Sequence, residues 1–134
     1  MKFNHLGIAV TNIENYFKTV LQPVFNCQTM SQIYTDELQK TKIAFVTTID
    51  GTCIELVEPL GDDSPISSIL KNKRGGLYHL CFEANNFKQD IETCKQNKFI
   101  LVSAPKPAIA FNNRQVAFFL TPSNELIELL EEQK

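Results

Sequence analysis

Apolar and polar positions follow the same pattern twice along this chain. Three pairs of segments match in the same order: NHLGIAV (4–10) with YHLCFEA (78–84), KIAFV (42–46) with QVAFF (115–119), and CIELVEP (53–59) with LIELLEE (126–132). The steps between the paired segments are 74, 73 and 73 residues, a difference that one loop can absorb. Three matches in register rarely arise by chance, so the pattern predicts an internal repeat.

Each half of the chain predicts a strand, then a helix, then three shorter strands. Short segments in which apolar and polar residues alternate indicate half-buried strands. The predicted strands cover residues 4–10, 28–34, 42–48 and 52–57 in the first half, and 78–84, 100–103, 115–120 and 126–130 in the second. The repeated unit is therefore predicted to be β-α-β-β-β.

The two predicted helices have polar residues where helices begin. Thr11 and Glu14 have the spacing of a capping box, and Pro23 is expected to end the first helix. Asn86 is expected to cap the second helix. The apolar stripes consist of Ile13, Tyr16 or Phe17, Val20 and Leu21 in the first helix, and of Phe87, Ile91 and Cys94 in the second.

The segment between the halves predicts a short linker helix at about 64–73. Ser64 is expected to be its N-cap and Pro65 its first helical residue. Gly75 and Gly76 then allow the chain to change direction into the second half.

We expect neither half to bury both faces of its sheet alone. The prediction is therefore one α+β domain over residues 1–134, with module one at about 1–60 and module two at about 75–134. The two tandem β-α-β-β-β modules are expected to be related by pseudo-twofold symmetry.

The strand pattern places one histidine and one glutamate of each half on a common sheet face. Residues two apart in a strand share a face, and the large apolar neighbours of these four residues point to the other one. The four residues are His5 and Glu55 in the first half and His79 and Glu128 in the second.

Buried carboxylates are unfavourable unless a cation compensates them. Two imidazoles and two carboxylates suit a borderline divalent metal, and zinc, cobalt, nickel, manganese and iron all fit this donor set. The alternative is that these are exposed strand residues or hydrogen-bonded core groups. Four matched positions in a repeat favour the metal.

Composition narrows the class of protein. A chain of 134 residues with 43% hydrophobic residues fits one compact unit with a core, and a net charge of -2 gives no support for general nucleic-acid binding. No apolar run approaches a membrane span, and the first residues lack a signal-peptide layout. Four cysteines without CxxC spacing indicate thiols in a reducing compartment. A soluble cytoplasmic protein is therefore predicted.

From NHLGIAV to IELLE the chain resembles the vicinal oxygen chelate superfamily, also called the glyoxalase/bleomycin-resistance/dioxygenase fold. The resemblance implies a cup-shaped, curved mixed sheet with a metal site built from four strands. His5, Glu55, His79 and Glu128 match the four ligand positions of that site. Members often form homodimers, so the resemblance also implies a homodimer.

Within the superfamily, ELVEPLGDDSPISSIL, RGGLYHLCFE and RQVAFF are most similar to the methylmalonyl-CoA epimerases. This similarity implies a metal-dependent epimerase or isomerase that removes a proton alpha to the carbonyl of a CoA or other thioester. It gives Glu128 the roles of ligand and acid/base. Lys71, Lys73 and Arg74 could meet CoA phosphates, although a solvated basic loop explains them equally well.

Two departures from the epimerase pattern keep other functions open. Ile43 occupies the position where some epimerases have a second glutamate base, and Asp36 or Glu37 could replace it only by reaching in. Glu55 lies where several epimerases have glutamine, and the set His/Glu/His/Glu resembles bacterial glyoxalase I, a lactoylglutathione lyase. The further alternatives are a non-catalytic protein that binds a small molecule such as an antibiotic, and an inactive structural relative.

Overall fold

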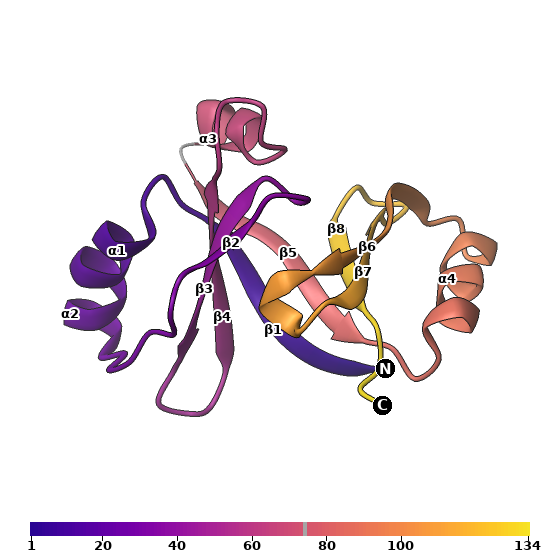
Figure 1. The fold of residues 1–134 in the computed structure, drawn as a ribbon, viewed down its shortest axis with the longest axis horizontal. Helices are drawn as coiled ribbons and strands as arrows, with labels where there is room; N and C mark the ends of the chain where they lie inside the picture. The colour runs from indigo at the N-terminus through magenta and orange to yellow at the C-terminus, as the bar shows by residue number, and fades with distance from the viewer. Residues whose placement is uncertain (74) are drawn as a thin grey trace. The chain divides into compact units, whose positions relative to one another are not determined.

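A computed structural model describes residues 1–73 and 75–134 of the chain (Figure 1). In chain order its elements are β1 (Lys2–Ala9), α1 (Ile13–Tyr16), the π-helical turn η1 (Phe17–Leu21), α2 (Gln22–Phe25), β2 (Tyr34–Asp36), β3 (Thr41–Thr47), β4 (Cys53–Pro59), α3 (Ser67–Lys73), β5 (Gly76–Glu83), α4 (Phe87–Gln96), β6 (Ile100–Ala108), the 3-10 turn η2 (Ile109–Phe111), β7 (Arg114–Leu120) and β8 (Leu126–Leu130).

The strand pairing confirms the repeat and the predicted α+β class. The hydrogen-bonded strand order is β2-β3-β4-β1-β5-β8-β7-β6. In both repeats the first strand pairs in parallel with the last one, β1 with β4 and β5 with β8, and the other pairs within each repeat are antiparallel. Each repeat is therefore a β-α-β-β-β module, and the pairing is mixed.

The chain divides into two compact units. The first unit is His5–Tyr78, and the second unit combines Met1–Asn4 with His79–Lys134. The first strand of each repeat is thus shared between the units at its ends. The grouping of the whole chain into one domain, with modules at about 1–60 and 75–134, stays a prediction.

Asparagine caps the main helix of each repeat. The backbone N–H of Asn15 donates to Asn12 Oδ1 at 2.8 Å, and that of Gln89 donates to Asn86 Oδ1 at 3.1 Å. The prediction of Asn86 as N-cap is confirmed. The prediction of Thr11 is wrong by one residue, because the asparagine that follows it supplies the capping oxygen.

Pro23 does not end the first helix, contrary to the prediction. The helical segment continues through α2 to Asn26, which has a left-handed conformation with φ 54°. The N–H of Gln22 bonds to the carbonyl of Phe17, five residues back, so a π-helical turn shifts the hydrogen-bond ladder before the proline. Pro23 then occupies the first turn of α2, a position where proline is tolerated.

The linker helix exists as α3, but it begins at Ser67 rather than next to Ser64. The N–H of Ser67 bonds to the carbonyl of Ser64 at 3.0 Å, and the side chain of Ile66 is completely buried. Residues 64–66 therefore form a turn that anchors Ile66 in the core. The predicted capping role of Ser64 is wrong for this reason.

Most predicted strands match within a few residues, with two exceptions. The strand predicted at 28–34 is wrong, because β2 starts only at residue 34. Ser31 instead binds β3 from a loop: its N–H donates to the carbonyl of Phe45 at 2.8 Å, and its Oγ accepts from the N–H of Phe45 at 2.9 Å. β6 is longer than predicted and reaches residue 108, with register shifts against β7.

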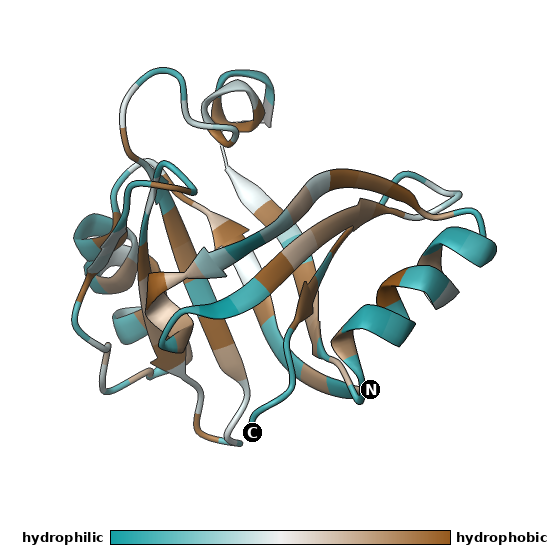
Figure 2. Cartoon of the chain, turned by 45° about the vertical axis from the view of Figure 1, so that its right-hand side comes forward, coloured by the Kyte–Doolittle hydropathy of each residue, from teal (hydrophilic) through white to brown (hydrophobic). Residues whose placement is uncertain are grey.

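Each unit buries an apolar core between its helix and one face of its strands. The first unit's core consists of Val10, Ile13, Phe17, Leu21, Cys27, Ala44, Val46 and Leu56. The second unit's core beneath α4 consists of Ala84, Phe87, Ile91, Ala117, Phe119 and Leu129. Figure 2 shows the division between largely apolar strands and a largely hydrophilic α4. Among the described residues, no helix combines the length and apolar character needed to cross a membrane.

Candidate metal centre

The first unit holds His5 and Glu55 against each other on adjacent parallel strands. His5 is on β1 and Glu55 on β4, where Gly7 is the direct partner of Glu55. His5 Nε2 lies 3.3 Å from Glu55 Oε2, and both side chains are buried, 0% and 3% exposed. A carboxylate and an imidazole therefore meet within the first unit in a site shielded from bulk water.

The second unit has the same arrangement at the equivalent positions of its strands. His79 is on β5 and Glu128 on β8, where Cys81 is the direct partner of Glu128. His79 Nε2 lies 2.8 Å from Glu128 Oε2, with both side chains buried. In each unit the histidine precedes the glutamate's partner by two residues, so the sheet register produces the same pair twice.

A phenylalanine completes each pair. Phe45 is the antiparallel partner of Glu55, and Phe118 is that of Glu128. The ring centroid of His5 lies 6.1 Å from that of Phe45, and the ring centroid of His79 lies 5.5 Å from that of Phe118, both edge to face. These contacts hold the imidazole planes and exclude water from one side. The sequence carries this signal, since KIAFV and QVAFF place the two phenylalanines one repeat apart.

The geometry of each pair fits two ligands of one divalent ion. The paired donor atoms are 3.3 Å and 2.8 Å apart, close enough for both atoms of a pair to reach a single ion. Each unit therefore contains a buried His/Glu pair that could bind a metal ion, and imidazole with carboxylate is a donor set of the borderline metals.

In each repeat, a glutamate that the sequence analysis did not single out binds the N-terminus of a helix. It lies near the end of the strand that carries Glu55 in the first repeat and just after the strand that carries Glu128 in the second. The N–H of Ile13, in the first turn of α1, donates to Glu58 Oε1 at 3.1 Å. The N–H of Phe87, in the first turn of α4, donates to Glu132 Oε2 at 2.9 Å. Negative charge at a helix N-terminus is favourable, and here it fixes the strand that carries the site glutamate. No local pattern reveals this contact, because its partners are 45 residues apart in both repeats.

Cys53 borders the first pair as a neutral thiol. It lies two residues before Glu55 on β4 and on the same strand face. Burial raises the pKa of the Cys53 thiol, an effect that His5 opposes and Glu55 reinforces. A thiol with a raised pKa is protonated at neutral pH.

Ile43 occupies the same strand face as the first pair. It is buried, pairs with Val57, and lies two residues from Phe45. Asp36, which the sequence analysis considered as a replacement, is buried at the end of β2. Its Oδ1 accepts the N–H groups of residues 38 and 39 and so closes the turn after β2. Glu37 is exposed in that turn.

The residues predicted to meet CoA phosphates are only partly described. Lys71 is exposed on α3. The predictions for the Lys73 side chain and for Arg74 lie outside the described residues. Phosphate binding at this segment therefore stays a prediction.

Comparisons with known proteins show the family to which the chain is similar. The profile of the Glyoxalase/Bleomycin resistance protein/Dioxygenase superfamily matches residues 4–118. The mitochondrial methylmalonyl-CoA epimerase of Dictyostelium discoideum is 31% identical over 98% of this chain and 78% of that protein. The ethylmalonyl-CoA/methylmalonyl-CoA epimerase of Cereibacter sphaeroides is 30% identical over 87% of this chain and 86% of that protein.

A solved structure is similar over almost the whole chain. A methylmalonyl-CoA epimerase in complex with methylmalonyl-CoA and NH4+ has a TM-score of 0.80 and 18% identity, and the match covers 98% of this chain and 94% of that one. At this identity the similarity concerns the fold, which agrees with the two modules described above.

Proposed function

The chain belongs to the glyoxalase/bleomycin resistance protein/dioxygenase superfamily, and on that premise we propose that it is a divalent-metal-dependent acyl-CoA epimerase. The substrate class is a thioester with an acidic C–H alpha to its carbonyl, and methylmalonyl-CoA is the first compound to test. Epimerases of this compound are about 30% identical over most of the chain, which supports the choice of substrate.

The observation that carries the proposal is the repetition of one buried His/Glu/Phe arrangement in the same register. His5, Glu55, His79 and Glu128 would together hold one ion, and the shared ion would neutralise the two buried carboxylates. When bound, the ion supplies Lewis acidity that stabilises negative charge on the substrate carbonyl oxygen. The donor set suits zinc, cobalt, nickel, manganese or iron.

Glu128 is the proposed acid/base. One carboxylate oxygen takes the proton from the alpha carbon, and the electron pair of that C–H bond moves toward the carbonyl oxygen as an enolate forms. Return of a proton to the opposite face of the carbon inverts its configuration. Ile43 carries no titratable group and supplies no second base, so a different group must return this proton.

One observation favours a second candidate. Glu55 completes a His/Glu/His/Glu set like that of glyoxalase I, so a lyase acting on a glutathione hemithioacetal is the runner-up. Both candidates need the same ion and the same acid/base chemistry. They differ in the substrate whose alpha proton exchanges with solvent.

The first experiment is metal content by mass spectrometry on untagged wild-type protein and His79→Ala. The wild type is expected to hold about one divalent ion per chain, and the variant to lose most of it because one of four ligands is gone. Glu92→Ala, an exposed substitution on α4, is the matched control and should keep the metal. Wild-type protein that binds no ion after reconstitution would remove the basis of both enzymatic functions.

Deuterium exchange then separates the candidates. Incubation in heavy water should place deuterium on the alpha carbon of methylmalonyl-CoA and convert one epimer into the other. Exchange only in the methylglyoxal–glutathione adduct would favour the lyase. The predicted homodimer is checked on the same samples by light scattering.

A further inference from the structure

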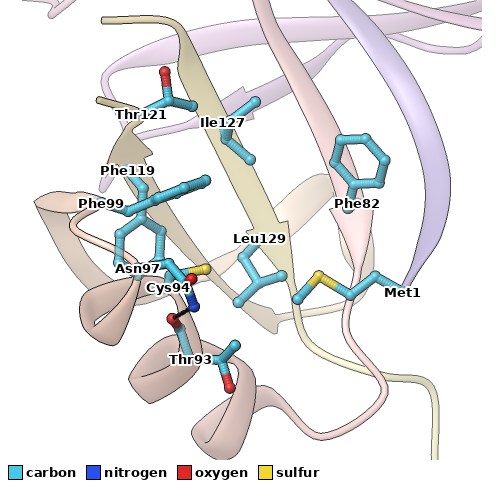
Figure 3. Close-up of a pocket in the computed structure, with 10 residues that line it drawn as sticks. All are labelled: Met1, Phe82, Thr93, Cys94, Asn97, Phe99, Phe119, Thr121, Ile127 and Leu129. Atoms are coloured by element: carbon cyan, nitrogen blue, oxygen red, sulfur yellow. Dashed lines mark hydrogen bonds between the residues drawn. The ribbon is translucent and has the colours of Figure 1, made fainter. Parts of the chain in front are cut away.

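A cavity of about 570 Å³ lies in the second unit, on the sheet face opposite the His79/Glu128 pair (Figure 3). Ile127 and Leu129 line it from β8, and both alternate with Glu128 along that strand. Thr93 on α4 lines the other side. The cavity therefore lies beside α4, on this face of the sheet, and does not belong to the candidate metal centre.

The lining is chemically uniform. Among the described residues that line the cavity, no side chain carries a charge. The polar side chains are already bonded within the chain: Thr93 Oγ1 donates to the carbonyl of Gln89 at 3.0 Å, and Asn97 Nδ2 donates to the carbonyl of Thr93 at 2.8 Å (Figure 3). The hydroxyl of Thr121 donates to the carboxylate of Glu125. A ligand in this cavity would thus meet mostly apolar surface and no charged side chain.

In the first repeat, side chains from a longer connection fill the position that corresponds to this cavity. The first-unit equivalents of Phe82, Ile127 and Leu129 are Ile8, Ile54 and Leu56. They pack in a core that also contains Cys27 and Met30, both from the long connection 26–33. In the second repeat only residues 97–99 connect α4 to β6. The second unit therefore lacks the segment that supplies this filling in the first.

We propose that this cavity is a binding site for a small molecule with an uncharged aliphatic chain. Its volume is within the usual range for small-molecule sites, about 300–1,000 Å³. Phe119 and Leu129, both almost completely buried, form the floor of the cavity, and a mostly apolar lining is typical of small-molecule sites. Each further methylene of the chain should raise affinity about fourfold until the cavity is full.

The test uses butanol, hexanol and octanol as probes on the full chain. Calorimetry is expected to show the fourfold step per methylene across this series. Octanol should also slow alkylation of Cys94, which lines the cavity, by N-ethylmaleimide. Cys53 is the internal control: it is a half-buried thiol in the first unit, and its alkylation rate should stay unchanged.

The repeat offers a matched pair of variants. Thr93 and Thr19 are exposed and one repeat apart, and each hydroxyl donates to the carbonyl four residues before it, at 3.0 Å and 2.7 Å. Thr93→Phe should block the cavity and lower octanol affinity at least tenfold, whereas Thr19→Phe should not change it.

Four results would overturn the proposal. Three are equal losses of affinity in both threonine variants, equal protection of both cysteines, and affinity that does not depend on chain length. The fourth is a lower molecular mass of Thr93→Phe in solution, because a second copy would then be the occupant. If Thr93→Phe fails to fold, the difference in protection between the two wild-type cysteines decides.

Discussion

The bond between the end of each candidate-site strand and the neighbouring helix can be tested by removing Glu132. Its Oε2 accepts the N–H of Phe87 at 2.9 Å, at the first turn of α4. A hydrogen bond to a charged group contributes about 1.5–3 kcal/mol when well shielded, and charge at a helix N-terminus contributes about 0.3–1 kcal/mol. Glu132 is only partly buried, so Glu132→Ala should lower the free energy of unfolding by about 1–2 kcal/mol.

The first repeat supplies the matching experiment. Glu58→Ala removes the equivalent bond to Ile13, 3.1 Å long, and should cost about the same free energy. Its additional pair with Lys42, at 3.6 Å, involves a lysine side chain that is 42% exposed, so this pair should add little. Glu132→Gln keeps an acceptor without the charge and should lose about half as much as the alanine variant.

Urea unfolding of the metal-free protein is the assay. The midpoint should fall while the slope with denaturant stays unchanged, because the folded state keeps its compactness. Glu92→Ala on the exposed face of α4 is the control and should change the free energy by less than about 0.5 kcal/mol. A Glu132→Ala midpoint equal to that of the control would refute the strand–helix bond, as would a loss confined to one repeat.

Three further predictions concern the metal, the linker and a thiol. A divalent ion at a hundred times its dissociation constant should stabilise the wild type by about 2.7 kcal/mol, seen as a higher melting temperature that a chelator reverses and that His79→Ala lacks. Gly75→Ala should destabilise the protein by more than about 1 kcal/mol in urea titration, because Gly75 has φ +108° and a Cβ there would lie 2.9 Å from the carbonyl oxygen of Ala9. Burial, with a smaller contribution from Asp90, raises the pKa of the Cys94 thiol. Cys94 should therefore react with maleimide more slowly than a free cysteine at neutral pH and accelerate as the pH rises beyond 9, followed by mass spectrometry; equal rates would contradict this environment.

The local sequence predicted the structure correctly where the covalent geometry of the backbone alone decides which way side chains point. Side chains alternate in every strand, so His5 and Glu55 could be assigned to a common face before any partner was known. The same holds for Asn86, whose capping bond spans only three residues. Two predictions failed because the periodicity of apolar residues does not contain the contacts that decide them. A π-helical turn accommodates Pro23, and the Ser31 hydroxyl replaces a strand pairing at Phe45.

By itself, then, the sequence determined the repeat, the two β-α-β-β-β modules and the four residues proposed as ligands, because these depend on spacing along the chain. Only the tertiary structure decided which residues meet. Parallel pairing sets the 3.3 Å and 2.8 Å His/Glu contacts, and antiparallel pairing brings a phenylalanine to each histidine. The second repeat has no equivalent of the segment 26–33, and this leaves a cavity beneath α4. The pattern of the strands does not predict that cavity. Contacts across tens of residues depend on strand register and on how side chains fill space, and neither is a property of a short stretch of sequence.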